Sequence, residues 1–485
     1  MRTWLWSMLL IPALARADEI STRAAKLHAE AIVVDTHLDA PDQLAAKWAD
    51  IAVRGATDHF DLPRAKAGGL TAPFFSIYVA AGYADHGAAR RALELIDLTR
   101  RAVDAHPGEA TLAASVADIR AAKQAGKLAV LMGIEGGHAI EDSLGALREL
   151  YRAGVRYMTL THTNTNHWAD SSGPFYEPDF DPKRSAVHHG LTAFGKDVVK
   201  EMNRLGMIVD VSHVSDDTIR DVLAVSRAPV MASHSSCRAL SNMPRNLTDD
   251  QLKQIAAKGG VVMINFGSAF LEQKVYDQLQ RALASVRPAY AKVKAAYGKD
   301  PVRMRSELKA LYAQLGKPAR AAWTKVVDHI EHVIAVAGED AVGIGADFDG
   351  IEDPPVGLED VSLLPRLSEE LLRRGHRGPI SSISRRGLRS RGHAAVPQEA
   401  YGDFATRPIR SARLLTRRIR GAIRQADIFG VSWHAVIDAA RGQGREIWNN
   451  LPAGERLRLV RHLRPFWDVH RFRIAPQVEA ALVAA

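Results

Sequence analysis

Eight short apolar runs rich in Val, Ile, Leu and Met follow one another along the chain, each with a helix-like pattern after it. They are Ala31–His37, Ala72–Val79, Leu128–Glu135, Arg156–His162, Met207–His213, Pro229–His234, Gly260–Phe266 and Ala341–Asp347. Runs of this length predict buried strands, and strands that alternate with helices predict a parallel sheet. Eight such units favour an α/β fold closed into a TIM-type (β/α)8 barrel over an open doubly wound sheet.

The segments between the runs support this fold. Asp142–Ala153 and Thr192–Leu205 carry apolar residues at helical spacing, and a glycine follows each of them. Ala269–Gly338 is too long for one connection, and its periodic apolar positions predict a helical insertion between the seventh and eighth strands, over one mouth of the barrel. An amphipathic helix is predicted from Leu358 to about Arg374.

Residues with metal-ligand chemistry stand where five of the apolar runs end. They are His37 and Asp39, Glu135, His213, His234 and Asp347. The carboxyl ends of barrel strands meet at one face, which is where the active sites of such barrels lie. The sequence therefore predicts a hydrolytic metal site at that face.

The spacing within the runs suggests roles for these residues. His37 and Asp39 lie two apart on a strand end, so their side chains point to the same side and can grip one ion. Glu135 ends a buried strand and must be paired or coordinated, and a bridging carboxylate is its natural role. His213 and His234 could complete the shell of a second ion. The alternative for each histidine is a hydrogen-bonded core residue.

Asp347 completes the set. Two ions roughly 3.5–4 Å apart polarise a carbonyl and lower the pKa of a bridging water, which becomes a nucleophile near neutral pH. A carboxylate beside them can relay the proton of that water to a departing amine. The alternative for Asp347 is an aspartate that caps a loop.

The N-terminus has the pattern of a secretory signal over residues 1–17. Arg2 is followed by the apolar stretch Trp4–Leu14 and by the small-x-small pattern Ala15–Ala17. The apolar stretch is too short for a permanent transmembrane helix, so we expect an exported, periplasmic or secreted protein without a transmembrane anchor. A buried first helix is the alternative.

Composition and cysteine content limit the other classes. With 47% hydrophobic and 25% charged residues, the chain is not predominantly disordered. Cys237 is the only cysteine, which excludes an intrachain disulfide and leaves a small buried residue or, less simply, a thiol nucleophile.

The ordered motifs TLTH, EGG, DVSH, SHSS and DFDG resemble the membrane (renal-type) dipeptidase family of zinc peptidases, from about Ala31 to about Gly375. The resemblance implies two zinc ions per chain: His37 and Asp39 bind one, Glu135 bridges, and His213 and His234 bind the other. Many family members are dimers, and the resemblance leaves a homodimer open.

The resemblance also implies how substrate is held. His162, in YMTLTH, contacts the substrate and its tetrahedral oxyanion, Arg245, in MPRN, pairs with the substrate carboxylate, and Asp347 is the acid–base residue. Family members cleave dipeptides with free termini, many accept a D-residue on the carboxyl side, and some open β-lactam rings. An arginine fork and a donor for the oxyanion also fit such a substrate chemically.

The family pattern stops near Gly375, where the composition changes. From Arg373 to the end there are 22 arginines and 8 acidic residues, and no lysine follows Lys325. We therefore expect a dipeptidase domain over 18–375, an irregular Arg, Gly and Ser-rich linker over 376–409 and a helical tail over 410–485. The stretch IWNNLPAGERLRLVRHLRPFWDVHRFRIAPQV resembles the end of a family of FAD/NAD(P)-binding oxidoreductases, but no nucleotide fingerprint precedes it.

Three functions stay open from the sequence. The first is an exported zinc dipeptidase, and the second is a metal-dependent hydrolase of a cyclic amide or lactam on the same barrel. The third is an inactive remnant produced by fusion or frameshift near Gly375. The basic tail could bind an anionic surface, but its arginines are not interleaved with stacking aromatic residues, and no nucleic-acid partner is expected.

Overall fold

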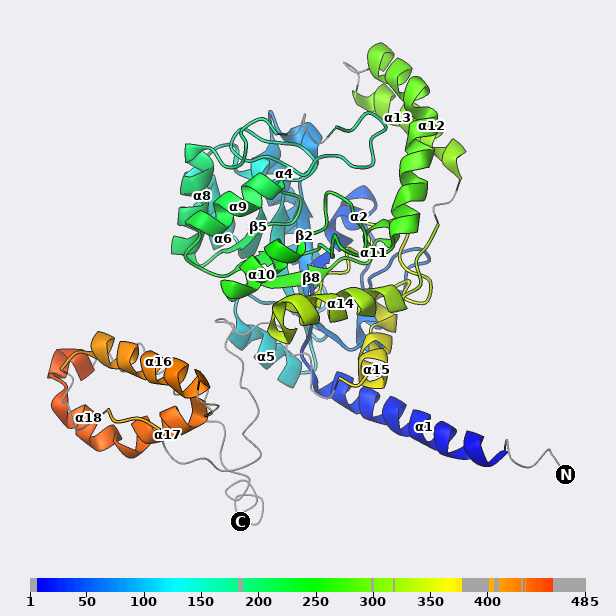
Figure 1. The fold of residues 1–485 in the computed structure, drawn as a ribbon. Helices are drawn as coiled ribbons and strands as arrows, with labels where there is room; N and C mark the ends of the chain where they lie inside the picture. Colours follow the sequence, from blue (N-terminus) through cyan, green and yellow to red (C-terminus); the bar gives the residue numbers. More distant parts are fainter. Residues whose placement is uncertain are drawn as a thin grey trace. The chain divides into compact units, whose positions relative to one another are not determined.

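The computed structural model describes residues 7–181, 186–297, 301–316, 319–376, 401–404, 410–428, 431 and 433–456. The chain forms two compact units, Met1–Leu388 and Arg389–Ala485 (Figure 1). The division falls among residues 377–400, so most of the predicted linker lies outside the described residues. The two units are described separately.

The first unit contains a closed barrel of eight parallel strands, as predicted from the apolar runs. The strands are β1 (Val33–Leu38), β2 (Leu70–Tyr78), β4 (Leu128–Glu135), β5 (Val155–Thr159), β6 (Ile208–Asp210), β7 (Val230–Ala232), β8 (Val261–Ile264) and β9 (Val342–Ile344). Each pairs in parallel with its neighbours, and the β2–β4 and β1–β9 pairings close the ring. A short extra strand, β3 (Ala110–Leu112), pairs with β4 outside the ring and was not predicted.

Most of the strands are shorter than the apolar runs that predicted them, and buried aspartates explain two of the cases. The Asp210 carboxylate accepts the backbone N–H groups of Ser212 and Ser233, at 3.1 and 2.8 Å. The Asp35 carboxylate on β1 likewise accepts the N–H groups of His37 and Ala346, and Ala346 lies two residues beyond the end of β9. A carboxylate therefore replaces ladder hydrogen bonds at these two strand ends, which frees the residues beyond them to turn toward the barrel mouth.

The floor of the barrel is filled by side chains. Tyr157 on β5 is fully buried and packs beside Phe74, with ring centres 5.3 Å apart. Gly133 on β4 makes the room for this ring, because a Cβ at that position would lie 2.0 Å from the Tyr157 ring. These side chains therefore form a packed core beneath the mouth of the barrel.

Helices cover the outside of the barrel. They include α2 (Ala40–Ala46), α3 (Leu62–Ala67), α4 (Ala88–Asp104), α5 (Val116–Gln124), α6 (Leu144–Arg152), α8 (Ala193–Leu205), α9 (Asp216–Val225) and α10 (Asp249–Ala257). Side chains of Ser143, Thr192, Ser215 and Thr248 cap the starts of α6, α8, α9 and α10. The helices predicted over Asp142–Ala153 and Thr192–Leu205 are confirmed as α6 and α8.

One predicted helix begins later than expected. The structure has a 3-10 turn at Val361–Leu363 and then α15 (Pro365–Arg373), whereas the pattern predicted a helix from Leu358. The Asp360 side chain accepts the N–H of Ser362 and caps the turn. Pro365 then occupies the first turn of α15, where its missing N–H costs nothing.

The predicted helical insertion between the seventh and eighth barrel strands is confirmed. After α11 (Ser268–Leu271) the chain forms α12 (Gln273–Tyr297) and α13 (Pro301–Tyr312), and α14 (Thr324–Ala337) leads back to the barrel (Figure 1). Side chains of α12 hold the loop after β5: Arg287 donates to the Pro178 carbonyl at 2.6 Å, and the Tyr290 hydroxyl donates to Glu177 at 2.9 Å.

The chain before the barrel is helical from Ser7 to Glu30 (α1). Its later turns pack on α15: the Ser21 hydroxyl donates to Glu369, and the His28 ring bonds Ser368 and the Gly68 carbonyl. The predicted cleavage pattern lies within this helix, and residues 1–6 lie outside the described part of the chain. Among the described residues, none of the helices combines the length and apolarity that crossing a membrane requires.

The described part of the second unit is helical, as predicted. It contains α16 (Ala412–Ile428), α17 (Trp433–Gly442) and α18 (Gly444–Asn450). A small apolar core holds them together, made by Phe404, Leu415, Ala426, Val436, Ala439, Ile447 and Leu451. Residues 457–485, which carry much of the second resemblance, lie outside the described residues.

Candidate metal centre

The strand-end residues predicted to bind metal converge on one carboxylate at the carboxyl ends of the strands. Glu135 ends β4, and its Oε1 lies 2.9 Å from Nε2 of His213 and 3.3 Å from Nε2 of His234. Its other oxygen, Oε2, lies 3.5 Å from Nε2 of His37. Three imidazole nitrogens thus face the two oxygens of one buried glutamate.

A second carboxylate pair stands on the other side of His37. The Nε2 atom of His37 is 3.4 Å from Oδ2 of Asp39 and 3.9 Å from Oδ1 of Asp347. The ligand atoms form three overlapping groups, each within 4.8 Å: His37, Glu135 and His234; Glu135, His162 and His213; and His37, Asp39 and Asp347. Glu135 and His37 each belong to two groups, so neighbouring groups share residues.

The chemistry of these atoms fits divalent cations. Nε2 of His37, Nε2 of His234 and Oδ1 of Asp39 are buried, and none has a hydrogen-bond partner among the described residues. Buried polar atoms without partners are costly, and a cation shared between imidazole lone pairs and carboxylates satisfies them together. Nitrogen and oxygen ligands of this kind suit Zn²⁺ and several other divalent ions.

The protonation states at the centre agree with a ligand role. Burial lowers the pKa of His213 and of His234 well below the usual value, so both rings are neutral at pH 7. Burial alone would raise the pKa of Glu135, but the surrounding histidines outweigh it and hold this pKa well below its usual range. Neutral imidazoles around an ionised carboxylate are the forms that bind metal.

His37 differs from the other two rings. Burial opposes its protonation, but Tyr157, Glu135 and Asp39 together raise its pKa well above the usual value. In the absence of a cation this ring therefore carries a proton between the carboxylates. A metal ion competes with that proton for the same nitrogen.

Two of the site residues have left-handed backbone conformations. The φ angles of His213 and Asp347 are +65° and +62°. Residues other than glycine adopt this region at a cost and do so mostly at functional sites. At His213, hydrogen bonds from Ser172 N and Thr161 Oγ1 to its carbonyl, at 2.7 and 3.0 Å, hold the turn.

Asp347 lies at the edge of the cluster and behaves unlike Glu135. Burial raises its pKa well above the usual range, and Asp39 and Glu135 add to this effect against the opposing influence of His37. The Asn265 side chain donates to its Oδ2 at 2.8 Å. A carboxylate whose pKa is raised is a stronger base than usual and is suited to proton transfer.

His162 lies on the exposed side of Glu135, with its Nε2 3.8 Å from Oε1. Burial lowers its pKa to about 4, so the ring is neutral at pH 7. The Tyr78 and His213 rings flank it at centroid distances of 4.8 and 4.3 Å.

Arg245 approaches the centre from the segment after β7 and is only 3% exposed. It donates to the Ser235 hydroxyl at 3.3 Å and to the His234 carbonyl at 3.2 Å, and its Nε has no partner among the described residues. None of the described carboxylates forms an ion pair with it, and burial lowers its pKa to about 10. A buried guanidinium without a counter-ion is a site for a carboxylate ligand.

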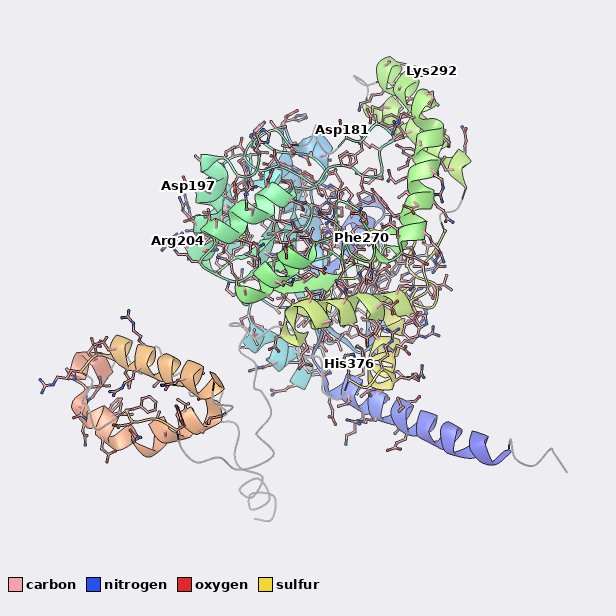
Figure 2. All side chains as sticks on the ribbon, viewed as in Figure 1. Asp181, Asp197, Arg204, Phe270, Lys292 and His376 are labelled. Atoms are coloured by element: carbon pink, nitrogen blue, oxygen red, sulfur yellow. The ribbon has the colours of Figure 1, made fainter. Side chains whose placement is uncertain are left out.

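An aromatic residue supports this guanidinium. The Cζ atom of Arg245 lies 5.4 Å from the centre of the Phe270 ring, and Phe175 packs edge-on against the same ring at a centroid distance of 5.8 Å. Figure 2 shows Phe270 at the inner end of the helical insertion, with Lys292 far out along α12. The insertion and the loop after β5 thus meet beside Arg245.

Sequence reasoning missed four residues around this centre. Tyr157 contacts His37, Asn265 contacts Asp347, and Asp210 and Asp35 fix strand ends. Each is a polar residue inside or at the end of an apolar run. The same pattern predicted the six strand-end residues of the metal centre. Cys237 is fully buried, and burial raises the pKa of its thiol, which favours the prediction of a small buried residue over a nucleophile.

Comparisons with known proteins agree with this geometry. The family model of membrane dipeptidases, peptidase family M19, matches residues 21–386. Dipeptidase 3 of Macaca fascicularis is 34% identical over 420 residues, covering 81% of this chain and 74% of that protein.

Solved structures are similar as well. The probable dipeptidase PvdM from Pseudomonas aeruginosa aligns with a TM-score of 0.63 at 27% identity, over 74% of this chain and 94% of that one. A metallopeptidase from Rhodobacter sphaeroides, solved with a phosphinate mimic of the dipeptide L-Ala-D-Ala, aligns with a TM-score of 0.57 at 27% identity, over 72% of this chain and 95% of that one.

Proposed function

The chain belongs to the membrane dipeptidase family, peptidase family M19, and we propose that it hydrolyses dipeptides with free termini at a centre for two Zn²⁺ ions. The observation that carries this proposal is Glu135, one buried carboxylate faced by the Nε2 atoms of three histidines. Hydrolysis of a peptide bond needs an activated water and a polarised carbonyl, and a two-ion centre supplies both.

The ligand roles follow from how the side chains group around His37 and Glu135. His37 and Asp39 would hold one ion, His213 and His234 would hold the other, and Glu135 would be shared between the two. Divergent Oε1 and Oε2 contacts, to His213 on one side and to His37 on the other, support the bridging role. Two zinc ions per chain is therefore the proposed stoichiometry.

Arg245 and His162 position the substrate. The unpaired guanidinium of Arg245 donates hydrogen bonds to the free carboxylate of the dipeptide. The carboxylate would compensate the buried positive charge of Arg245. His162, neutral and on the exposed side of Glu135, donates a hydrogen bond to the oxygen on which negative charge develops. A charged anchor close to the centre favours substrates with a carboxylate one residue beyond the scissile bond.

Asp347 moves the proton. Its raised pKa and its contact with Asn265 place a carboxyl group at the edge of the cluster that can take a proton from the attacking water and pass it to the departing amine. Tolerance of a D-residue on the carboxyl side is part of the proposal. It is supported by the L-Ala-D-Ala mimic bound to the similar metallopeptidase from Rhodobacter sphaeroides.

Export belongs to the same proposal. Residues 1–17 form a cleaved signal, residues 18–375 form the catalytic domain, and the protein acts in the periplasm or outside the cell. The family match begins at residue 21, after the predicted cleavage point, which supports the boundary after residue 17. N-terminal sequencing of the protein recovered from the periplasm would test it, and an intact Met1 would contradict it.

The deciding experiment measures amino-acid release from L-Ala-L-Ala and L-Ala-D-Ala by protein beginning at Asp18. The expected result is cleavage that a chelator abolishes and zinc restores. Zinc-loaded, folded protein that opens a β-lactam but cleaves neither dipeptide would favour the cyclic-amide alternative. Protein that melts early, holds no zinc and cleaves nothing would favour the inactive remnant. Sedimentation of the same sample tests the homodimer that many family members form.

A further inference from the structure

Two hydroxyl groups lie behind the metal-facing histidines, on the side away from Glu135. The phenol oxygen of Tyr157 is 2.9 Å from Nδ1 of His37 and donates its hydrogen to the Thr36 carbonyl at 3.1 Å. A phenol has one proton. If that proton goes to Thr36, the hydrogen bond to His37 exists only when Nδ1 of His37 is the donor.

The second hydroxyl repeats this arrangement with different residues. The Ser233 oxygen is 2.8 Å from Nδ1 of His234 and donates to Oδ2 of Asp210 at 2.6 Å. Oδ1 of Asp210 accepts the N–H groups of Ser212 and Ser233, and its Oδ2 also accepts the Thr159 hydroxyl, so Asp210 is an acceptor at both oxygens. The serine proton is therefore committed to the carboxylate, and Nδ1 of His234 must be the donor in the bond to Ser233.

We propose that Tyr157 and Ser233 are positioning residues that lock a proton on Nδ1 of His37 and of His234, so that Nε2 is the nitrogen each ring leaves to a metal ion. The proposal rests on the two-ion function above. A neutral imidazole has one donor and one acceptor nitrogen, so fixing the proton on Nδ1 fixes the lone pair on Nε2. Both hydroxyls contact Nδ1, the nitrogen that faces away from Glu135, so both act only through a histidine.

The free ends of the two rings support this assignment. Nε2 of His37 and Nε2 of His234 are buried without a hydrogen-bond partner among the described residues. The two rings lie together, with centroids 3.8 Å apart. In each ring, therefore, one nitrogen is held by a hydroxyl and the other is left for a cation.

The packing shows that the position of Tyr157 is defined. Its ring is fully buried and lies against Gly133, where a Cβ atom would clash with the ring. His213 provides the contrast, because its Nδ1 has no partner among the described residues. The lock therefore applies to two of the three histidines.

A hydrogen-bond partner that fixes the tautomer of a metal ligand raises metal affinity. Loss of such a partner typically lowers metal affinity 10–100-fold. The test compares zinc affinity, by competition with a chromophoric chelator, in full-chain wild type, Tyr157→Phe and Ser233→Ala. Ser233→Thr keeps a hydroxyl and should keep affinity near the wild-type value. We expect Kd for at least one of the two ions to rise 10–100-fold in Tyr157→Phe and in Ser233→Ala, with altered visible absorption of the cobalt-loaded protein.

Matched controls separate this role from packing. Tyr290→Phe removes another buried phenol, which donates to Glu177 on the helical insertion, and Ser241→Ala removes another buried hydroxyl, which donates to the Ala269 carbonyl. Both should lower the melting temperature as much as the test variants without changing zinc affinity. Equal zinc affinity in all variants would overturn the lock, whereas a wild type that holds no metal would overturn the proposed function instead.

Discussion

Replacing Arg245 with methionine should stabilise the protein while it damages catalysis. The guanidinium is buried, none of the described carboxylates pairs with it, and burial lowers its pKa from 12.5 to about 10. A base whose pKa falls on folding loses stability at every pH where it is charged, and 2.5 units correspond to about 3 kcal/mol. Methionine keeps much of the apolar volume beside Phe270 and removes the charge.

Part of this gain in stability is offset. The methionine variant lacks the hydrogen bonds that Arg245 donates to the Ser235 hydroxyl and the His234 carbonyl, each worth about 1 kcal/mol. We therefore expect a net stabilisation of about 1 kcal/mol, which raises the melting temperature by about 2 °C in a domain of this size. The sign of the change is the informative part, because most buried substitutions destabilise.

Catalysis should change in the opposite direction. A bidentate guanidinium–carboxylate contact is worth about 3–4 kcal/mol when both groups are desolvated, so kcat/KM for a dipeptide should fall about 10²–10³-fold. A dipeptide whose C-terminus is amidated offers no carboxylate. Wild type should cleave it about as slowly as the variant does, and the variant should show little preference between the two substrates.

The assay pairs thermal melting with kinetics on L-Ala-L-Ala and its amide, and Arg204→Met serves as the matched control. Arg204 forms a two-point ion pair with Glu201 of the same helix, α8, with both contacts at 2.7 Å. Its loss should lower the melting temperature slightly and leave kcat/KM unchanged. The reasoning about Arg245 is refuted if its variant melts below wild type by as much as the control, or if wild type cleaves the amide as fast as the free dipeptide.

Three further outcomes are expected. Glu135→Gln should lower zinc content per chain and activity together, as measured by elemental analysis, because a neutral amide bridges two cations poorly; full activity would contradict the bridging role. Asp347→Asn should keep its zinc and lose about 10²–10⁴-fold in kcat, and loss of zinc would instead make Asp347 a ligand. Burial lowers the pKa of the fully buried His329 from 6.5 to about 4. Below pH 6.5 the unfolded chain binds a proton at this ring while the folded protein does not. The free energy of unfolding is therefore unaffected above pH 6.5 and falls by about 3 kcal/mol toward pH 4. His329→Asn should remove that part of the pH dependence in urea melts, and an unchanged slope would show that the ring is not the cause.

The sequence predicted the barrel and the site through the same signal. Apolar runs of strand length are detectable because both faces of a parallel strand are buried, and Glu135 or His213 is visible because a polar residue ends such a run. The ends of the strands were less predictable. β6 stops at Asp210 because that carboxylate captures the N–H groups of Ser212 and Ser233, which depends on a neighbouring strand far away in sequence.

Residues that act through the barrel interior were hidden for a related reason. Tyr157 looks like an ordinary strand residue, and its role depends on Gly133 opposite it and His37 above it, which only the closed barrel brings together. The left-handed backbone of His213 and Asp347 was equally hidden, because neither is a glycine. These features were not predicted because they depend on contacts between segments far apart in the sequence, which a local sequence pattern does not contain.

The predicted change of sequence pattern near Gly375 would affect stability more than chemistry, and the family match itself continues to residue 386. All the proposed site residues lie between His37 and Asp347, toward the carboxyl ends of the strands. The last described helix of the first unit, α15, packs at the other end, where its Leu367 and Leu371 line a small apolar cavity with Val33 and Val342, the first residues of β1 and β9. In such barrels the carboxyl-end face carries catalysis and the amino-end face carries stability. An altered C-terminus should therefore affect how readily the barrel unfolds before it affects the metal centre, which argues for an active dipeptidase over an inert remnant.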